Sequence, residues 1–188
     1  MHAHAIDNLR YIRQTMERAG SFTAVPGTGG ILMGAIALAA SLWAGRISDI
    51  RSWLLIWVAT AVVALSIGVI FAARKARAVK MPLLSGPGKK FILGLVPPIL
   101  AGAIITAALY RAGSPGLIPG AWMLLYGTGV LTGGAASVRV VPVMGICFML
   151  MGTATLFAPA SWRNELMAAG FGGIHILFGT IITVKYGG

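Results

Sequence analysis

Acidic residues are scarce in this chain of 188 residues, which has four Asp and Glu against fifteen Lys and Arg. The acids are Asp7, Glu17, Asp49 and Glu165, and all lie outside the long apolar runs. Carriers driven by protons or sodium generally use carboxylates inside the membrane, so this class is disfavoured. The lone cysteine, Cys147, excludes an intrachain disulfide. With 10% charged and 57% hydrophobic residues, the chain is too apolar for a soluble domain and is predicted to lie in a membrane.

Six apolar runs each approach the roughly 20 residues that a helix needs to cross the hydrocarbon core. They are residues 29–44, 53–73, 91–110, 117–136, 140–159 and 167–184. We therefore expect an all-α polytopic membrane protein with a single six-helix transmembrane domain over residues 21–188. Its halves are about 21–80 and 91–188, joined by a basic linker at 74–90.

Basic residues are distributed unequally between the loops. Eleven belong to one side of the predicted membrane domain and four to the other. Six of the eleven lie in the linker: Arg74, Lys75, Arg77, Lys80, Lys89 and Lys90. Because basic loops stay in the cytoplasm, both termini are predicted to be cytoplasmic, in a membrane that we take to be the bacterial cytoplasmic membrane. The linker is expected to bind anionic lipid headgroups or a partner protein, and no nucleic acid is expected.

Residues 1–20 show helical periodicity, because Ala5, Leu9, Ile12 and Met16 recur at spacings of four and three. Arg10 lies among the polar residues of the other face. One interpretation is an amphipathic helix on the cytoplasmic leaflet. The other is a docking helix for a partner membrane subunit or for a second copy of the chain.

The segment 18–46 reappears at an offset of 93 residues, with ten identities over twenty-nine positions. Arg18 to Ser21 returns as Arg111 to Ser114, and Gly34 returns as Gly127. Three spans per copy would place the second copy upside down in the membrane. The sequence therefore predicts a 3+3 inverted repeat, a design that in transporters puts the substrate site near the midplane between the repeats.

Glycine and proline mark where a pathway could run. Gly30 and Gly34 are four residues apart, as are Gly129 and Gly133, and both pairs are expected to let helix backbones approach closely. Pro97 and Pro98 fall inside the third run and should kink or interrupt that helix, with Pro97 inside the bundle because freed carbonyls cannot face lipid. His175 is the one ionisable side chain near the centre of a run, and either a functional or a structural hydrogen-bonding role fits it. We expect it to face the bundle.

A resemblance adds one alternative. Gly127-Thr128-Gly129 and His175 followed by Gly179 resemble the serine and histidine segments of rhomboid intramembrane proteases, which also have six spans. The resemblance implies that Thr128 would act as the nucleophile and His175 as its base. Thr128 stands where that family has serine, and the second run has neither the histidine nor the asparagine of the family.

Three functions are therefore carried forward. The first is a small transporter or channel for a neutral or weakly anionic solute, with His175, Thr128, Gly34, Gly127, Pro97 and Pro98 as candidates to line its pathway. The second is a non-catalytic membrane subunit or sensor that docks through residues 1–20 and the basic linker. The third is a rhomboid-like protease. No cofactor or metal is predicted, because His2 and His4 lie far from His175 along the chain.

Overall fold

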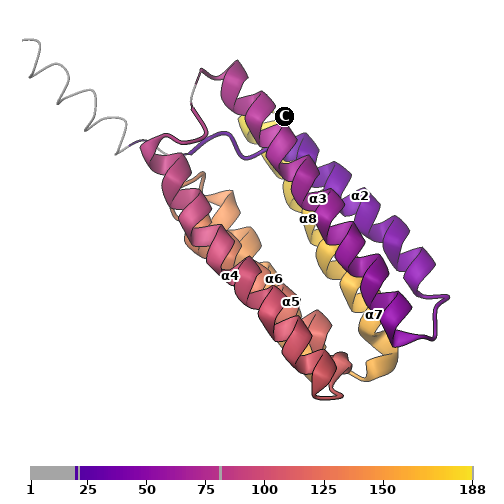
Figure 1. The fold of residues 1–188 in the computed structure, drawn as a ribbon. Coiled ribbons are helices and arrows are strands. Elements are labelled where there is room, and N and C mark those ends of the chain that lie inside the picture. Colours follow the sequence, from indigo (N-terminus) through magenta and orange to yellow (C-terminus); the bar gives the residue numbers. More distant parts are fainter. Residues whose placement is uncertain (1–19, 21, 81, 188) are drawn as a thin grey trace, which may run out of the picture.

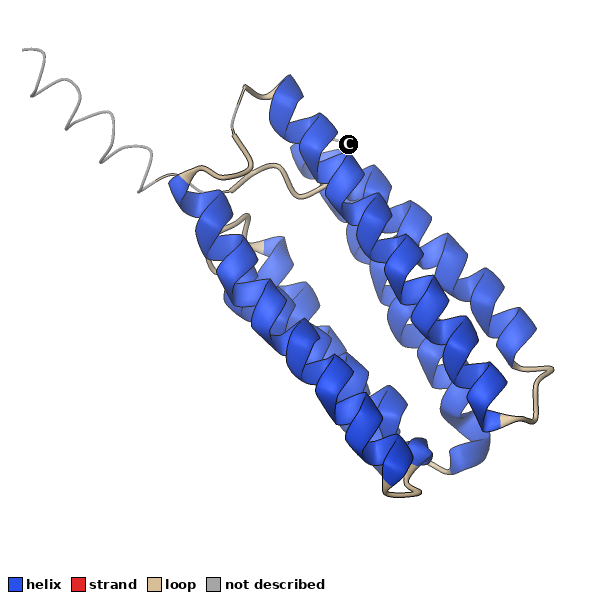
Figure 2. Cartoon of the chain, in the orientation of Figure 1, coloured by secondary structure: helices blue, strands red, loops and turns tan. Residues whose placement is uncertain are grey.

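The computed structural model describes residues 20, 22–80 and 82–187, and all long elements in these ranges are helices (Figure 1). They are α2 (Gly27–Ala44), α3 (Ile50–Ala78), α4 (Gly86–Arg111), α5 (Ile118–Gly134), α6 (Val140–Phe157), α7 (Arg163–Met167) and α8 (His175–Tyr186). A π-helix, Ala168–Ile174, joins α7 to α8, and the other connections are loops or single 3-10 turns (Figure 2). The amphipathic helix expected at residues 1–20 lies, apart from Gly20, outside the described residues.

Five helical segments are long and apolar enough to cross a membrane: α2, α3, α4, α6 and the continuous run Ala160–Tyr186. α3 and α4 leave most of their side chains on the outside of the molecule, including Val69, which is 65% exposed, and Ile104, which is 71% exposed. Such an apolar exterior matches a lipid environment. The sixth apolar run forms α5, which has only 17 residues, so its crossing remains a prediction.

The helices pack as two groups of three (Figure 1). The first body contains α2, α3 and the α7–α8 segment, and the second body contains α4, α5 and α6. The last span therefore packs with the first two, which the division of the chain at residues 74–90 did not anticipate. α2 and α5 run in opposite directions, since the residues just before α2 bond to those just after α5. The 3+3 repeat itself remains a prediction.

Glycines let the helices of each body approach to backbone contact. A methyl group built on Gly34 would lie 2.6 Å from the carbonyl oxygen of Gly172, and one on Gly127 would lie 2.7 Å from that of Gly145. Carbon atoms do not approach oxygen so closely without displacement, so no side chain separates α2 from the π-helix or α5 from α6 at these points. Close packing of this kind drives helix association in lipid, where burial of apolar surface from water is not available.

The proline pair in α4 does not interrupt the helix, and the prediction that Pro97 lies inside the bundle is wrong. α4 is continuous from Gly86 to Arg111, and Pro97 is exposed and does not face the bundle. Because Pro98 has no N–H, the carbonyl of Gly94 lacks its usual helical partner. The hydroxyl of Thr132 on α5 lies 2.9 Å from that oxygen and also 2.8 Å from the carbonyl of Thr128. The neighbouring helix thus offers a donor to the Gly94 carbonyl, and α4 continues past the proline pair.

One end of the molecule is closed by the segment that precedes α2. The backbone N–H of Phe22 donates to the carbonyl of Ala136, and the Ser137 hydroxyl donates to the carbonyl of Phe22 at 2.5 Å. Phe22 and Ala24 are buried and pack with Ala76 near the end of α3. The segment therefore ties the first body to the loop between α5 and α6.

The opposite end carries the start of α3, where Asp49 caps the helix. Its carboxylate accepts hydrogen bonds from the Ser52 hydroxyl at 2.6 Å and from the Ser52 backbone N–H at 2.8 Å. These two bonds hold the pKa of the Asp49 carboxyl below its usual range. This cap explains why the chain turns back into the membrane domain only a few residues after α2 ends.

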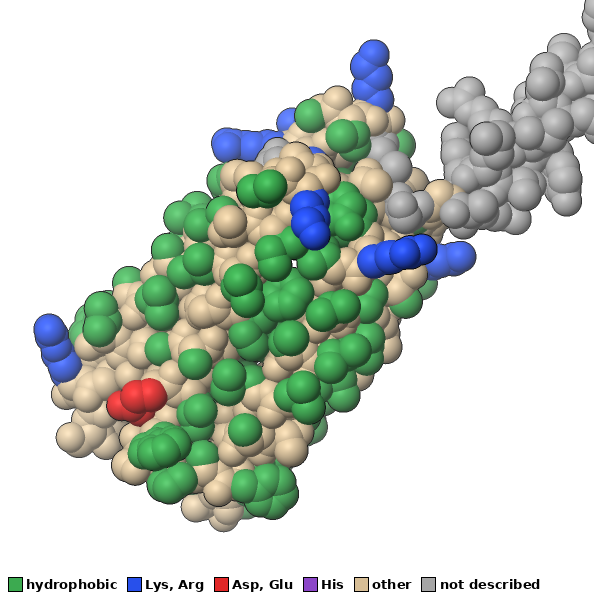
Figure 3. All heavy atoms as spheres, turned by 180° about the vertical axis from the view of Figure 1, so that it is seen from behind, with side chains coloured by type: hydrophobic (Ala, Val, Ile, Leu, Met, Phe, Trp, Pro, Cys, Tyr) green, Lys and Arg blue, Asp and Glu red, His purple; other side chains and the backbone are tan. Residues whose placement is uncertain are grey.

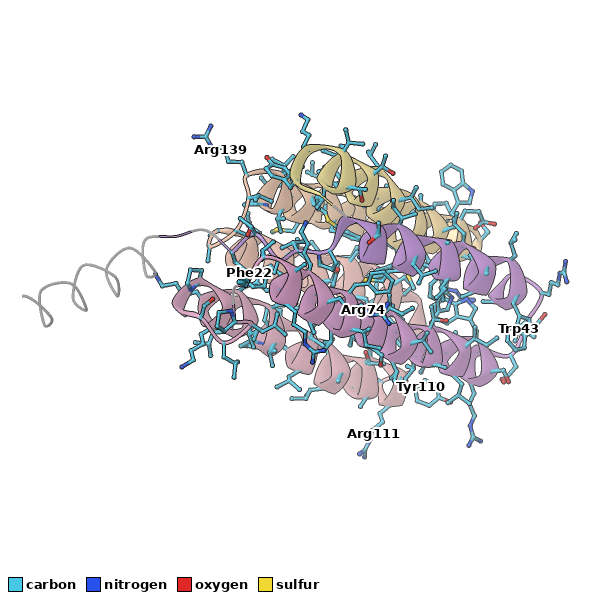
Figure 4. All side chains as sticks on the ribbon, turned by 90° about the horizontal axis from the view of Figure 1, so that it is seen from above. Phe22, Trp43, Arg74, Tyr110, Arg111 and Arg139 are labelled. Carbon is cyan, nitrogen blue, oxygen red and sulfur yellow. The ribbon has the colours of Figure 1, made fainter. Side chains whose placement is uncertain are left out.

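Charged residues lie at the two ends and leave a wide apolar band between them. Eight basic residues lie at the end that holds the C-terminus, which we call the basic end: Arg74, Lys75, Arg77, Lys80, Lys89, Lys90, Arg139 and Lys185. Four lie at the opposite end: Arg46, Arg51, Arg111 and Arg163. Lys and Arg side chains gather at the basic end in Figure 3, and Arg111 and Arg139 extend away from the helices in Figure 4. This asymmetry fits an orientation with the basic end in the cytoplasm.

The glycine contacts predict a stability difference between two alanine substitutions. Gly34→Ala should lower the stability of the folded protein by about 1–3 kcal/mol, because the added methyl overpacks the contact with the π-helix. Gly173→Ala is the matched control, since a methyl there meets nothing within 4 Å. Thermal unfolding in detergent measures both. Equal effects at the two positions would show that the close approach of α2 does not limit stability.

The orientation predicts the labelling of single cysteines in a Cys147→Ser background. Leu84→Cys lies in the loop before α4 at the basic end, and Gly116→Cys lies in the turn before α5 at the opposite end. A membrane-impermeant maleimide applied to intact cells should label Gly116→Cys and leave Leu84→Cys unlabelled until the cells are opened. The reverse pattern would place the basic end outside.

Candidate functional site

A cavity of about 390 Å³ lies between the two bodies. α3 and α4 form facing walls, and α2, α5 and the α7–α8 segment contribute the remainder. Its volume falls within the range of about 300–1,000 Å³ that is typical of ligand sites. No Asp, Glu, Lys or Arg of the described ranges lines it. The cavity is therefore an uncharged compartment between the charged ends of the molecule.

His175 lies at the wall of this cavity, at the first position of α8. It follows the π-helix, in which the usual i→i−4 pattern of backbone hydrogen bonds is shifted, and the His175 backbone N–H bonds to the carbonyl of Gly172. The side-chain Nδ1 lies 2.9 Å from the carbonyl oxygen of Phe171. π-helical turns are often found at functional sites. Here the π-helix leaves the carbonyl of Phe171 able to accept a hydrogen bond from the imidazole of His175.

The two ring nitrogens of His175 have distinct roles. A carbonyl can only accept a hydrogen bond, so the contact with Phe171 places a proton on Nδ1. Nε2 lies 2.8 Å from the hydroxyl of Tyr126, and in the neutral ring it accepts the hydrogen bond that this hydroxyl donates. The pair joins α8 of the first body to α5 of the second. Among the described residues, no other pair of side chains makes a hydrogen bond between the two bodies.

Aromatic rings surround the pair. The ring of Phe148 lies 4.9 Å from that of Tyr126 in an edge-on arrangement and 5.0 Å from the imidazole of His175. Phe171 stacks on the imidazole at 6.2 Å. His175 is 4% exposed and Phe148 is fully buried. These contacts fix the positions of both polar groups and leave little of the imidazole accessible.

The hydroxyl groups of the cavity wall and the indole of Trp122 also bond within the protein. The Thr60 hydroxyl donates to the carbonyl of Ile56, and the Thr106 hydroxyl donates to that of Gly102. The indole N–H of Trp122 donates to the Thr106 oxygen at 2.6 Å. The wall thus consists of apolar side chains and a few hydroxyl groups, and each of these hydroxyls already donates a hydrogen bond inside the protein.

The sequence candidates separate into three groups. His175 and Pro98 line the cavity. Gly34 and Gly127 instead make the helix contacts described above, and Pro97 is exposed. His175 faces the bundle, in agreement with the cost of placing it in lipid.

The structure does not assemble the pair that the protease resemblance implied. The hydroxyl of Thr128 donates to the carbonyl of Leu124 on its own helix, at 2.8 Å. Both ring nitrogens of His175 are occupied, by Tyr126 and Phe171. A base must lie within hydrogen-bonding distance of the hydroxyl it activates, and here its accepting nitrogen holds a different residue.

The six basic residues of the linker differ in how far they are buried. Lys75 is buried, and its ammonium group donates to the carbonyl oxygens of Val25, at 3.1 Å, and of Gly187. It therefore joins the ends of three chain segments inside the protein. The other five basic residues of the linker have exposed side chains, and the guanidinium of Arg74 lies over the ring of Phe71.

Tyr126 is the site residue that sequence reasoning missed. Its partner is 49 positions away, so no local pattern joins them. The available signal was a tyrosine, which has a polar tip, inside an apolar glycine-rich run. A tyrosine buried at that depth needs a partner for its hydroxyl, and His175 was the obvious candidate.

We expect a measurable coupling between the two side chains. Tyr126→Phe should lower stability because it strands Nε2 of His175, and His175→Ala should do so because it strands the tyrosine hydroxyl. In a double-mutant cycle the coupling should be about 0.5–2 kcal/mol. Tyr110→Phe is the control, since Tyr110 is 40% exposed. Additive effects of the two substitutions would mean that the hydrogen bond contributes nothing to folding.

Comparison with protein-family models, with curated proteins and with solved structures finds no match to this chain. The function therefore has to be inferred from the cavity and from the residues around it.

Proposed function

We propose that the protein is a small transporter that binds a neutral solute in the cavity between its two bodies. The observation that carries this proposal is the position of the cavity, which lies at the interface between two groups of helices and between two charged ends. We take α5 as the sixth crossing because it packs along α6 over most of its length. At one end, a methyl built on Gly120 would lie 3.0 Å from the carbonyl oxygen of Gly152, and at the other end Gly134 lies beside Pro142.

The lining favours a neutral solute over a weakly anionic one. An anion in a water-poor cavity needs a cation or several hydrogen-bond donors to replace its hydration. No cationic side chain of the described ranges lines the cavity, and the hydroxyl and imidazole protons are used internally. A neutral solute loses far less hydration and needs no such partner.

An inverted repeat supports the transporter reading, and the glycine contacts of α2 and α5 agree with the 93-residue offset. A methyl on Gly179 of α8 would lie 2.7 Å from the backbone nitrogen of Ile31, and one on Gly152 of α6 would lie 2.7 Å from that of Leu124. Ile31 and Leu124 are 93 positions apart, the same offset as Gly34 and Gly127. Ile31 and Leu124 thus lie at close backbone contacts on α2 and α5, the two helices that the offset relates, although a 3+3 repeat would pair α8 with α4 and not with α6.

The second candidate is a subunit or sensor that docks through its basic end. A second cavity, of about 280 Å³, lies there and is lined in part by the exposed residues Arg77 and Lys80. These side chains suit an anionic lipid headgroup or an acidic partner surface. We rank this function second because that cavity is formed mainly by loop residues and by the end of one helix.

The transporter proposal predicts that filling the central cavity abolishes solute binding. Gly102 lines the cavity, and a methyl there meets only the Leu125 side chain, at 3.8 Å. Gly102→Leu should therefore fold normally and weaken binding by at least about tenfold. Gly173→Leu, on an exposed face away from the cavity, is the matched control. Binding is measured as thermal stabilisation by a panel of uncharged compounds that includes glycerol, cyclohexanol and hexadecanol.

The same compounds separate transport from sensing. A solute that stabilises the protein should exchange across proteoliposomes faster than across liposomes without protein, and Gly102→Leu should remove the difference. Binding without faster exchange would favour the sensor. Stabilisation that is equal in the wild type, Gly102→Leu and Gly173→Leu would reject the cavity as the solute site.

A further inference from the structure

The facing walls of the cavity are consecutive in the chain but do not pack on each other. α3 packs mainly on α2, and α4 packs mainly on α5. Between them, Ala61 on α3 and Ala103 on α4 line the cavity and have exposed side chains, and the cavity is not enclosed. The cavity therefore reaches the outer surface between these two helices, past small side chains.

This opening lies at the depth of the hydrocarbon core. Ala61 is eleven residues beyond Ile50, the first residue of α3, which corresponds to about 17 Å along the helix. The exposed side chains around it are apolar, among them Val62 and Ile104. A molecule that enters here arrives from the lipid and not from water.

The hydrogen-bonding capacity of the wall restricts what can be held. The hydroxyls of Thr60, Thr106 and Tyr126 all donate within the protein. The indole N–H of Trp57 has no partner in the described part of the chain, but the atom is itself buried and does not reach the cavity surface. The wall therefore offers hydroxyl oxygens as acceptors and no free donor.

We infer that the substrate is a lipid-soluble, uncharged molecule with a hydrocarbon body, taken from the bilayer core through the opening between α3 and α4. This inference rests on the proposed function and names its substrate class and its route of entry. The polar group that fits such a wall is a hydroxyl, which can donate to an unused oxygen lone pair. A sugar or a polyol would leave most of its hydroxyls without partners, at a cost that the wall cannot offset.

The test uses photo-labelling in lipid nanodiscs with three diazirine probes: a hexadecanol, the corresponding hexadecanoate and a short water-soluble diol. Labelled residues are mapped by mass spectrometry after a short incubation. The alcohol should label the cavity walls, and the charged hexadecanoate and the diol should label them at least about tenfold less. Equal labelling by the diol would overturn the substrate class.

Entry is tested by narrowing the opening. Ala103→Trp and, independently, Ala61→Trp should slow cavity labelling by the alcohol about tenfold or more, whereas Ile104→Trp, beside the opening but not part of the cavity wall, should not. Both blocked positions are exposed, and thermal unfolding checks that each variant folds. If the alcohol labels the cavity normally in both blocked variants but no longer labels it in Gly102→Leu, lateral entry is rejected and the proposed function is kept. Labelling that is unchanged in Gly102→Leu as well would reject the cavity and the proposed function together.

Discussion

Backbone contact at glycines is the constraint on which the rest of this structure depends. In lipid, apolar side chains gain little by leaving their surroundings, so helices associate where their backbones can approach closely. Gly34 against Gly172 and Gly127 against Gly145 provide such points in the first and second bodies. Once α2 is paired with α8 and α5 with α6, the remaining helices, α3 and α4, can each cover only one side of a pair. The space between them is the cavity.

The polar groups follow from the same absence of water. Each hydroxyl or carbonyl that a helix cannot satisfy must find a partner in a neighbouring helix. Gly94 loses its donor to Pro98 and lies within reach of the Thr132 hydroxyl, and His175 accepts from Tyr126. The second of these bonds uses the Tyr126 proton at the cavity wall, where the hydroxyls of Thr60 and Thr106 also donate within the protein. The neutral character of the cavity is therefore a consequence of how the helices are held together.

The sequence predicted the positions of the apolar helices, because the length and composition of a run are local properties. It also indicated His175, since an imidazole in an apolar run is costly and has to be buried. It could not predict that the last span packs with the first two, because apolar glycine-bearing helices offer many pairings of similar energy. Three features depend on how the helices pair and so could not be predicted. They are the Tyr126 partner of His175, the π-helix before α8 and the exposure of Pro97. For the same reason the protease-like residues Thr128 and His175 look related in the sequence but bond to different groups.

The contacts within each body differ from the contacts between the bodies, and this difference bears on how the two bodies could move. Within each body, backbones touch at glycines, and separating them would cost contacts along whole helices. Between the bodies, the described bonds are the Tyr126 to His175 pair near the cavity and the contacts of Phe22 at the basic end. Rotation of one body against the other breaks few hydrogen bonds and keeps both glycine pairs intact. Such a rotation would also separate apolar contacts between the bodies, among them that of Phe148 with Phe171. Tyr126 and His175 lie at this surface, beside the cavity.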